Sequence, residues 1–179
     1  MRSTLPLLAL AVLTAPAFAQ TLDAGHSQIG FTLKQLNVPV DGQFKQFSAK
    51  VNFDAAKPQA SLADITIQTA SIALPTADAN NQAKQKDWFN VAQFPTARFV
   101  STSIKPLATG RFQVAGKLTI KGITRDVSTA FTTKNEGGVT VVDGVLPISR
   151  LAYKIGEGEW ADTDTVADTV QIKFHVALK

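Results

Sequence analysis

Three polar residues near the start of the chain, Asp23, His26 and Ser27, are of the types that form a hydrolase triad. Such a triad needs a serine, a histidine and a carboxylate within hydrogen-bonding reach of one another. Neighbouring side chains on a strand point to opposite faces, so a strand that starts here separates His26 from Ser27. We therefore interpret His26 as a structural residue and predict that the protein is not an enzyme. A hydrolase that depends on His26 is the least favoured alternative.

Metal ligands are also few, because the chain has two histidines and no cysteine. Zinc sites normally use three or four ligands, among which histidine or cysteine is prominent. Asp162, Asp164 and Asp168 lie in a glycine-rich segment and resemble part of a calcium loop, but Val166 stands where an oxygen ligand is needed. We interpret this segment, with Glu157, as an exposed acidic loop. We predict no metal and no cofactor.

The elements that would carry these residues follow a targeting segment. Arg2, an apolar centre and the small residues at 17–19 have the layout of a cleaved secretory signal peptide. We predict that residues 1–19 are removed, that the mature chain starts at Gln20, and that residues 20–179 form one domain. No segment has the run of ~20 apolar residues that a membrane helix needs, so no integral membrane span is expected.

The composition limits the covalent chemistry and the partners. An exported chain without cysteine has no disulfide framework, so its core alone must hold the fold. The formal net charge is +4, and the basic residues are scattered singly, with no cluster beyond Lys84 and Lys86. Nucleic-acid sites gather their basic residues on one face or along one helix, so we expect no nucleic-acid partner.

Most of the chain after the targeting segment alternates apolar and polar residues, which is typical of strands with one buried face. The clearest case is the segment 112–121, where Phe112, Val114 and Leu118 fall on one side. Residues 37–42 are expected to form a turn. Eight strands are predicted, in the segments 27–36, 47–53, 63–72, 98–104, 112–121, 126–133, 139–149 and 170–178. No helix is long enough to cover a sheet face, so we expect an all-β fold, an antiparallel barrel or sandwich.

One stretch, residues 71–103, interrupts this alternation. Its polar first half gives way to Trp88, Phe89 and further apolar residues at spacings of three and four, which suit a short helical turn. We predict a short helical insertion around residues 77–92, with Asp78 as the cap at its start. Aromatic residues beside a polar segment suit a lid or plug, and they equally suit the anchor of a surface loop.

An eight-stranded barrel is either just filled by its side chains or holds one small ligand. The chain has 11 phenylalanines, yet several inward positions are small, among them Ala49, Gly116 and Val127. Large residues mixed with small ones leave room for a slender apolar guest, and they also suit a packed, tapering core. We favour the hollow barrel.

Five segments, taken together and in order, resemble the YceI-like family of exported polyisoprenoid-binding proteins. They are LDAGHSQIGFTLK, DGQFKQFSAKVNFD, DWFNVAQFPTARFVSTSI, GKLTIKGITRDV and VADTVQIKFHV. The resemblance implies an eight-stranded, antiparallel, lipocalin-like barrel in the bacterial periplasm. It also implies that the apolar interior holds a long isoprenoid chain, such as that of a polyprenyl phosphate or a quinone, as carrier or reservoir.

The chain departs from the family pattern in two places. Many relatives carry a threonine and a histidine before a DFF-like motif, where this chain reads SIALPTADANNQAKQKDWF, so a polar role at those positions is not transferred. The chain also has an acidic, glycine-rich loop at residues 156–164, around Trp160.

The barrel interior and the insertion together make the predicted binding site. The residues expected to line it are Phe31, Leu33, Phe47, Val51, Trp88, Phe89, Phe94, Phe99, Phe112, Val114, Leu118, Ile120, Phe131 and Phe174. A phosphate or other polar head must emerge at a barrel end, where Arg98, Lys121, Arg125 or Arg150 could donate charge-assisted hydrogen bonds. We favour the alternative that these four are ordinary turn and strand-edge residues.

A second function fits the same sequence. A solid barrel would suit an exported interaction or stress protein without a ligand, whose contact surface would be an exposed apolar patch around Trp160. A homodimer is compatible with either function.

Overall fold

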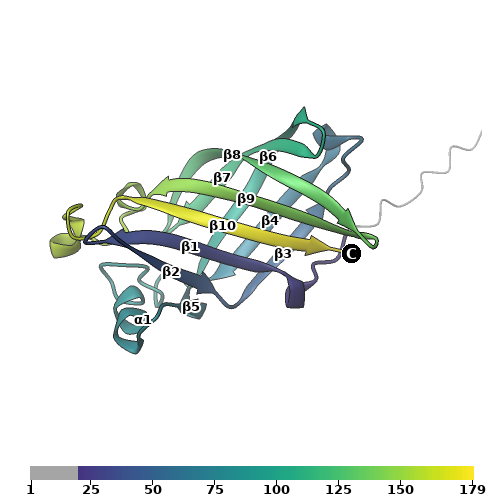
Figure 1. Cartoon of the computed structure of the whole chain (residues 1–179). Coiled ribbons are helices and arrows are strands. Elements are labelled where there is room, and N and C mark those ends of the chain that lie inside the picture. The colour runs from purple at the N-terminus through teal and green to yellow at the C-terminus, as the bar shows by residue number, and fades with distance from the viewer. Residues whose placement is uncertain (1–19) are drawn as a thin grey trace, which may run out of the picture.

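The computed structural model describes residues 20–179, so the predicted signal peptide lies outside the described residues. One antiparallel sheet of ten strands dominates the structure (Figure 1). The strands are β1 (Gln28–Gln35), β2 (Val38–Phe44), β3 (Phe47–Asn52), β4 (Leu62–Gln68), β5 (Ile72–Ala73), β6 (Thr96–Ala108), β7 (Arg111–Ile120), β8 (Ile123–Glu136), β9 (Val139–Ser149) and β10 (Thr169–Leu178). The α-helix α1 (Ala77–Ala83) and short 3₁₀ turns η1 (Ala24–His26), η2 (Pro58–Ala60), η3 (Thr69–Ser71), η4 (Leu151–Tyr153) and η5 (Gly158–Ala161) complete it. None of the helices within residues 20–179 combines the length and the apolar character needed to cross a membrane.

The strands follow the order β3-β4-β6-β7-β8-β9-β10-β1-β2-β5, and all neighbours are antiparallel. The sheet curls on itself, so its apolar face becomes the inside of a barrel (Figure 1). The segment that precedes β1 lies along the outer edge of β3, and we call this boundary the seam. There Gln20 forms an isolated bridge with Val51, and the Phe53 amide donates to Gln20 Oε1 over 3.0 Å. Among the described residues, isolated contacts of this kind close the seam in place of a continuous ladder.

The predicted fold class is confirmed, and the strand count rises from eight to ten. One additional strand is β2, because residues 37–42, expected to turn, are mostly extended. The turn is confined to Leu36 and Asn37, whose φ angles of 50° and 63° suit a two-residue hairpin turn. Pro39 fits within β2 because only the end of that strand has a second neighbour, β5, at this edge of the sheet.

The other additional strand, β5, comes from the predicted segment 63–72, whose alternation drifts near its end. The turn η3 breaks this segment into β4 and the two residues of β5, which pair with β2. The Thr69 hydroxyl, in a side chain only 1% exposed, donates to the Phe94 carbonyl over 2.8 Å. A buried side-chain hydrogen bond therefore replaces the ladder at the point where the chain leaves the sheet.

A short helix lies within the predicted insertion, but its cap differs from the prediction. The Thr76 hydroxyl accepts a hydrogen bond from a first-turn amide of α1 over 3.2 Å, while Asp78 lies inside that turn. The side chain of Asn80 bonds both the amide and the carbonyl of Leu74. Ala83, which is 4% exposed, is the buried anchor of the helix. From residue 84 the chain continues in successive turns that carry the aromatic residues.

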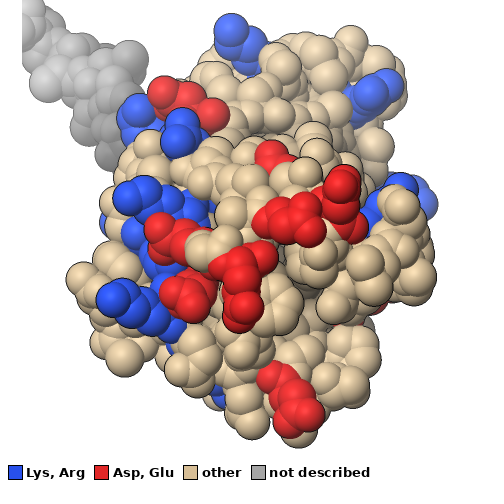
Figure 2. Space-filling view, turned by 90° about the vertical axis from the view of Figure 1, so that its left-hand side faces the viewer, with Lys and Arg blue, Asp and Glu red and all other residues tan. Residues whose placement is uncertain are grey.

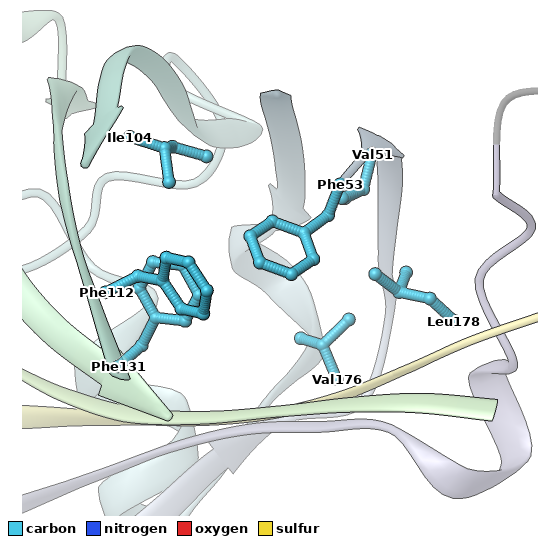
Figure 3. Close-up of a cluster of buried hydrophobic side chains, with 7 residues drawn as sticks. All are labelled: Val51, Phe53, Ile104, Phe112, Phe131, Val176 and Leu178. Carbon is cyan, nitrogen blue, oxygen red and sulfur yellow. The ribbon is translucent and has the colours of Figure 1, made fainter. Parts of the chain in front are cut away.

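Aromatic packing closes the end of the barrel at which the chain terminates. Figure 3 shows the buried side chains there pointing toward one another from several strands: Val51, Phe53, Ile104, Phe112, Phe131, Val176 and Leu178. Phe112 and Phe131 stack at 5.6 Å between ring centroids, and Phe53 meets their edges or faces at 5.1 and 5.8 Å. Such pairs stabilise a core beyond the area that they bury.

Candidate functional site

Two neighbouring cavities lie inside the barrel. The first cavity, beside the cluster of Figure 3, has a volume of about 130 Å³. The second cavity, toward the insertion, has a volume of about 90 Å³. Ile29, Ile67, Leu118 and Ile172 line both. The two spaces are therefore separated only by a constriction of aliphatic side chains.

The size and lining of these cavities suit an apolar guest. A void of about 150 Å³ lined by leucine, isoleucine and phenylalanine stays dry and accepts a benzene molecule. The first cavity is close to that size, and Thr129 supplies a hydroxyl to its wall, whereas the Ser128 hydroxyl bonds the exposed Gln113. The Thr129 hydroxyl already donates to the Val145 carbonyl over 2.6 Å. The site can thus bind by burying apolar surface, with little directional chemistry.

Three phenylalanine rings lie against the barrel wall because glycines face them. A Cβ atom at Gly144 would lie 2.2 Å from the ring of Phe174. The same relation joins Phe31 to Gly42 and Phe99 to Gly116, at 2.3 and 2.5 Å. Each ring occupies the place that a side chain on the neighbouring strand would take. Large residues therefore coat the wall and leave the centre of the barrel free.

Eleven of the fourteen predicted interior residues line a cavity, and nine of these eleven lie on predicted strands. Those in the first cavity are Val51, Phe99, Val114, Leu118, Phe131 and Phe174, and the second adds Phe31, Leu33, Trp88, Phe89 and Ile120. Phe112 is buried in the cluster of Figure 3. Phe47 instead lines a surface groove at the seam, and Phe94 packs against Gly122 at the turn after β7.

Several wall residues were missed, two of them although they carry the same sequence signal. Ile65, Leu146 and Ile172 line the first cavity, and Ile148 lines the second. Ile65 and Ile172 alternate with polar residues on predicted strands, so applying the alternation there would have found them. Leu146 and Ile148 are flanked by Val145 and Pro147, so alternation does not show which face of their strand is buried.

Two segments cover the second cavity. The Asp87 carbonyl, in the insertion, accepts hydrogen bonds from the amides of Gly156 and Glu157 over 2.7 and 2.8 Å. The rings of Trp88 and Trp160 lie 5.6 Å apart between centroids. The acidic loop (residues 156–164) thus braces the insertion, and Trp88 forms part of the cavity wall rather than only anchoring a surface loop.

Arg150 holds this cover in place through hydrogen bonds to its backbone carbonyls. Its side chain is 1% exposed, and its pKa is lowered by burial, an effect that Asp168 opposes. The five hydrogen bonds run from Nε to the Ala167 carbonyl, from Nη1 to those of Ile155 and Gly156, and from Nη2 to those of Trp160 and Val166, at 2.6 to 3.2 Å. A guanidinium has five N–H donors, so none is left for a ligand. Its central carbon also lies 5.8 Å from the centre of the Trp88 ring.

Lys121 is also engaged within the protein. Its side chain is buried, and the ammonium donates to the Lys154 carbonyl and to Glu157 Oε2, both over 2.7 Å. The hydrogen bond from Lys121 lowers the pKa of the Glu157 carboxyl below its ordinary value. Glu157, predicted to be an exposed-loop carboxylate, is therefore half of an ion pair that ties the acidic loop to the β7–β8 turn.

Of the remaining two predicted head-group residues, Arg125 contacts the turn that follows Arg150, and Arg98 lies elsewhere. Arg125 Nε donates to the Ala152 carbonyl over 2.8 Å, and its guanidinium lies 6.0 Å from the ring of Tyr153. Arg98 forms a two-pronged ion pair with Asp64, at 2.9 and 2.6 Å, with its side chain more than half exposed. The structure does not bring the four basic residues together, and Arg150 is the one that lines a cavity.

The residues of triad type are joined differently from a triad. His26 lies in η1, not on a strand as expected, and its Nδ1 is 2.9 Å from Asp23 Oδ2. The Ser27 hydroxyl donates to the Asp23 carbonyl over 2.7 Å and accepts from the Ala177 amide over 2.9 Å. The hydrogen bond from Lys179 lowers the pKa of Asp23, burial opposes it, and the hydrogen bond with His26 adds to the lowering. This cluster therefore ties the two ends of the described chain together.

The carboxylates of the acidic loop bond to their own neighbourhood. Asp162 accepts from the Asp164 amide and the Thr165 hydroxyl, which lower its pKa. Asp168 accepts from the Ser149 hydroxyl and the Leu151 amide. Within residues 20–179 no three histidine, cysteine or acidic residues converge as metal ligands would.

The sequence model of the YceI-like domain matches residues 20–178. This chain belongs to the YceI-like family. Its curated YceI-like relatives are named UPF0312 protein, and that of Pseudomonas savastanoi is 34% identical over 113 residues, covering 63% of this chain and 59% of the relative. The relative in Shewanella oneidensis is 30% identical over 154 residues, covering 86% of this chain and 70% of the relative. The match thus spans about three fifths of the first relative's length.

Solved structures share the YceI-like fold. BcnA of Burkholderia cenocepacia is 45% identical, with a TM-score of 0.86 over 88% of this chain and 99% of that one. The YceI protein of Campylobacter jejuni gives a TM-score of 0.68 at 24% identity, over 77% and 84% of the chains. A domain from Saccharophagus degradans, described as polyisoprenoid binding, gives a TM-score of 0.73 at 18% identity. The match covers 90% of this chain and 98% of that domain. The curled ten-stranded sheet is therefore the family's fold.

Proposed function

We propose that this YceI-like protein is exported to the periplasm and holds a long-chain isoprenoid inside its barrel, as carrier or reservoir. The observation that carries the proposal is the pair of neighbouring apolar cavities that share four aliphatic residues. The description of the Saccharophagus degradans domain as polyisoprenoid binding supports the choice of guest. The signal-peptide pattern of residues 1–19 supports export.

The cavity dimensions fit a slender chain better than a compact ring system. By comparison with the benzene-sized void, each cavity accepts roughly one five-carbon isoprene unit. Full burial of one such unit contributes about 4 kcal/mol, at about 0.8 kcal/mol for each carbon. Burial of two units would contribute about 8 kcal/mol, from which the loss of conformational entropy of the guest must be subtracted. The affinity is therefore no tighter than a dissociation constant of about 1 μM. A longer guest requires the interior to widen or part of the chain to leave the barrel.

The chemistry of the described residues supports binding rather than turnover. Ser27 and His26 have no hydrogen bond to each other, and the pKa shifts of the carboxylates come from ion pairs or local hydrogen bonds. The solid-core alternative needs a filled interior, which the two cavities count against.

The test is organic extraction and mass spectrometry of protein purified from its native periplasm. We expect an isoprenoid in the extract and an intact protein mass that begins at Gln20. Delipidated protein should rebind an added polyprenol and gain thermal stability in proportion to the logarithm of its concentration. An empty extract together with no rebinding would overturn the proposal and favour the ligand-free interaction protein.

A further inference from the structure

A surface groove adjoins the second cavity, and we call it the helix groove. It lies between α1 and the β1–β2 hairpin and has a volume of about 400 Å³. Both tryptophans of the chain, Trp88 and Trp160, stand in its wall. No residue of the helix groove lines the first cavity, so it lies at the opposite side of the second.

Only one layer of side chains separates the helix groove from the second cavity. Leu33, Leu74, Ala83 and Trp88 line both spaces. Three of these four belong to the segment from the end of β5 through α1 to the insertion. The seven-residue α1 is rich in asparagine and aspartate, which form weak helices, and rests on the barrel through Ala83. A small outward movement of α1 would join the groove to the interior.

The wall of the helix groove is mostly apolar, and its polar side chains include no basic one. Gln35, Thr76 and Gln82 offer amide and hydroxyl groups, and Asp78 is the charged residue among the lining side chains. Arg150, the cation on the second cavity, has all five donors occupied by backbone carbonyls. Figure 2, which looks onto this end of the barrel, shows acidic side chains across the face and basic ones mostly at its margins.

We propose that the helix groove is the entrance of the binding site and the seat of the guest's polar end, and that this end is uncharged. An alcohol or a carbonyl-bearing ring can exchange hydrogen bonds with the amides and lie against the tryptophans. A phosphate would meet Asp78 with no free cation on the wall. The inference rests on the proposed function, because it requires an apolar chain inside the barrel.

Two probes of equal chain length, geranylgeraniol and geranylgeranyl phosphate, test the charge selectivity. Binding is followed by the tryptophan fluorescence of the delipidated protein, whose two tryptophans both line the groove, below the micelle concentration of either probe. We expect the alcohol to bind at least about tenfold more tightly than the phosphate. Asp78→Asn should narrow that ratio, whereas Asp126→Asn, which removes an exposed carboxylate on β8, should leave it unchanged.

The entrance is tested by association rates of the alcohol. Ala79 lines the helix groove, whereas Ala77 on the same helix is exposed and does not. We expect Ala79→Trp to slow association about tenfold and Ala77→Trp to leave it unchanged. Gln82→Trp, at another lining position, provides the test if Ala79→Trp does not fold.

The outcomes separate the two proposals. If the phosphate binds as tightly as the alcohol, or if groove-filling variants bind at the normal rate, this inference is overturned while isoprenoid binding stands. If neither probe binds and native extracts are empty, the proposed function itself is wrong.

Discussion

Val114 is the position at which one substitution distinguishes a hollow barrel from a packed one. It lies on β7, where its backbone pairs with Ile104 and Thr129 of the neighbouring strands, and its half-buried side chain lines the first cavity. Gln113, the preceding residue, is exposed on the outer face and bonds Ser128 over 3.2 Å. Val114→Trp and Gln113→Trp therefore place the same indole on opposite sides of the wall.

The cavity volume sets the expected size of the effect. Val114→Trp adds about seven non-hydrogen atoms, close to the six of the benzene that a void of about 150 Å³ accepts. Filling the 130 Å³ of the first cavity gains up to about 3 kcal/mol, at about 24 cal/mol for each Å³. Burying the indole N–H without a partner costs about 1 to 3 kcal/mol. The two effects nearly cancel, so we expect the free energy of unfolding to change by less than about 1 kcal/mol.

A packed barrel would respond differently. Overpacking costs about 1 to 3 kcal/mol in addition to the unpaired N–H, so the loss would reach about 3 kcal/mol or more. For a domain of this size that loss lowers the melting temperature by roughly 6 to 12 °C. The comparison uses delipidated protein, because a bound guest stabilises the fold by mass action.

Ligand loading supplies the second readout. Val114→Trp should lose most of the isoprenoid that wild-type protein retains on purification, while Gln113→Trp should keep it. A variant that melts many degrees lower and still carries its full load would refute the reasoning, since the guest would then lie away from β7.

Three further changes test other parts of the structure. Arg150→Met leaves five backbone carbonyls without their donor, so urea unfolding should show a loss of at least about 3 kcal/mol; Arg98→Met, at an exposed ion pair, should cost under about 1 kcal/mol, and equal losses would contradict the assigned role. Gly144→Ala brings a methyl group against the ring of Phe174, which must swing into the first cavity, so extracts should contain less isoprenoid, and an unchanged yield counts against the account of the wall. The pKa of Glu157 is lowered by its hydrogen bond to a lysine, so its contribution is present above the ordinary value of 4.5 and lost as pH falls through the folded value. The melting temperature of Glu157→Gln should therefore lie below wild type at neutral pH and approach it in acid, and a constant gap would speak against the ion pair.

Alternation predicted the strands and many of the residues that face the interior because it is a local signal, whereas the choice of a barrel over a sandwich came from the family resemblance. Alternation along β7 or β10 states which side chains face inward, whatever strand lies alongside. Phe47 shows the limit of that signal: it has the inward parity of β3, but β3 borders the seam, so its side chain lines a surface groove. The alternation shows on which face of the sheet a side chain lies, but not whether its strand is in the middle or at the edge of the sheet.

The cover of the second cavity could not be predicted in this way. Arg150 has carbonyl partners between residues 155 and 167, and backbone carbonyls carry no sequence signature. A buried arginine without a carboxylate partner cannot be told from an exposed turn residue by its type. The pairing of Lys121 with Glu157 is similarly non-local, since it joins residues 36 positions apart.

The seam affects how far the circumference of the barrel can change. A barrel closed by a full ladder has a fixed circumference, because neighbouring strands are held about 4.7 to 4.9 Å apart. Here the bridge from Gln20 to Val51 and the hydrogen bond from the Phe53 amide to Gln20 hold the segment before β1 against β3. Farther along, the peptide chain itself crosses, because residues 45–46 join β2 to β3 and η3 joins β4 to β5. The barrel can therefore widen beside Val51 by breaking a few hydrogen bonds, whereas the covalent chain fixes its circumference at the β2–β3 junction.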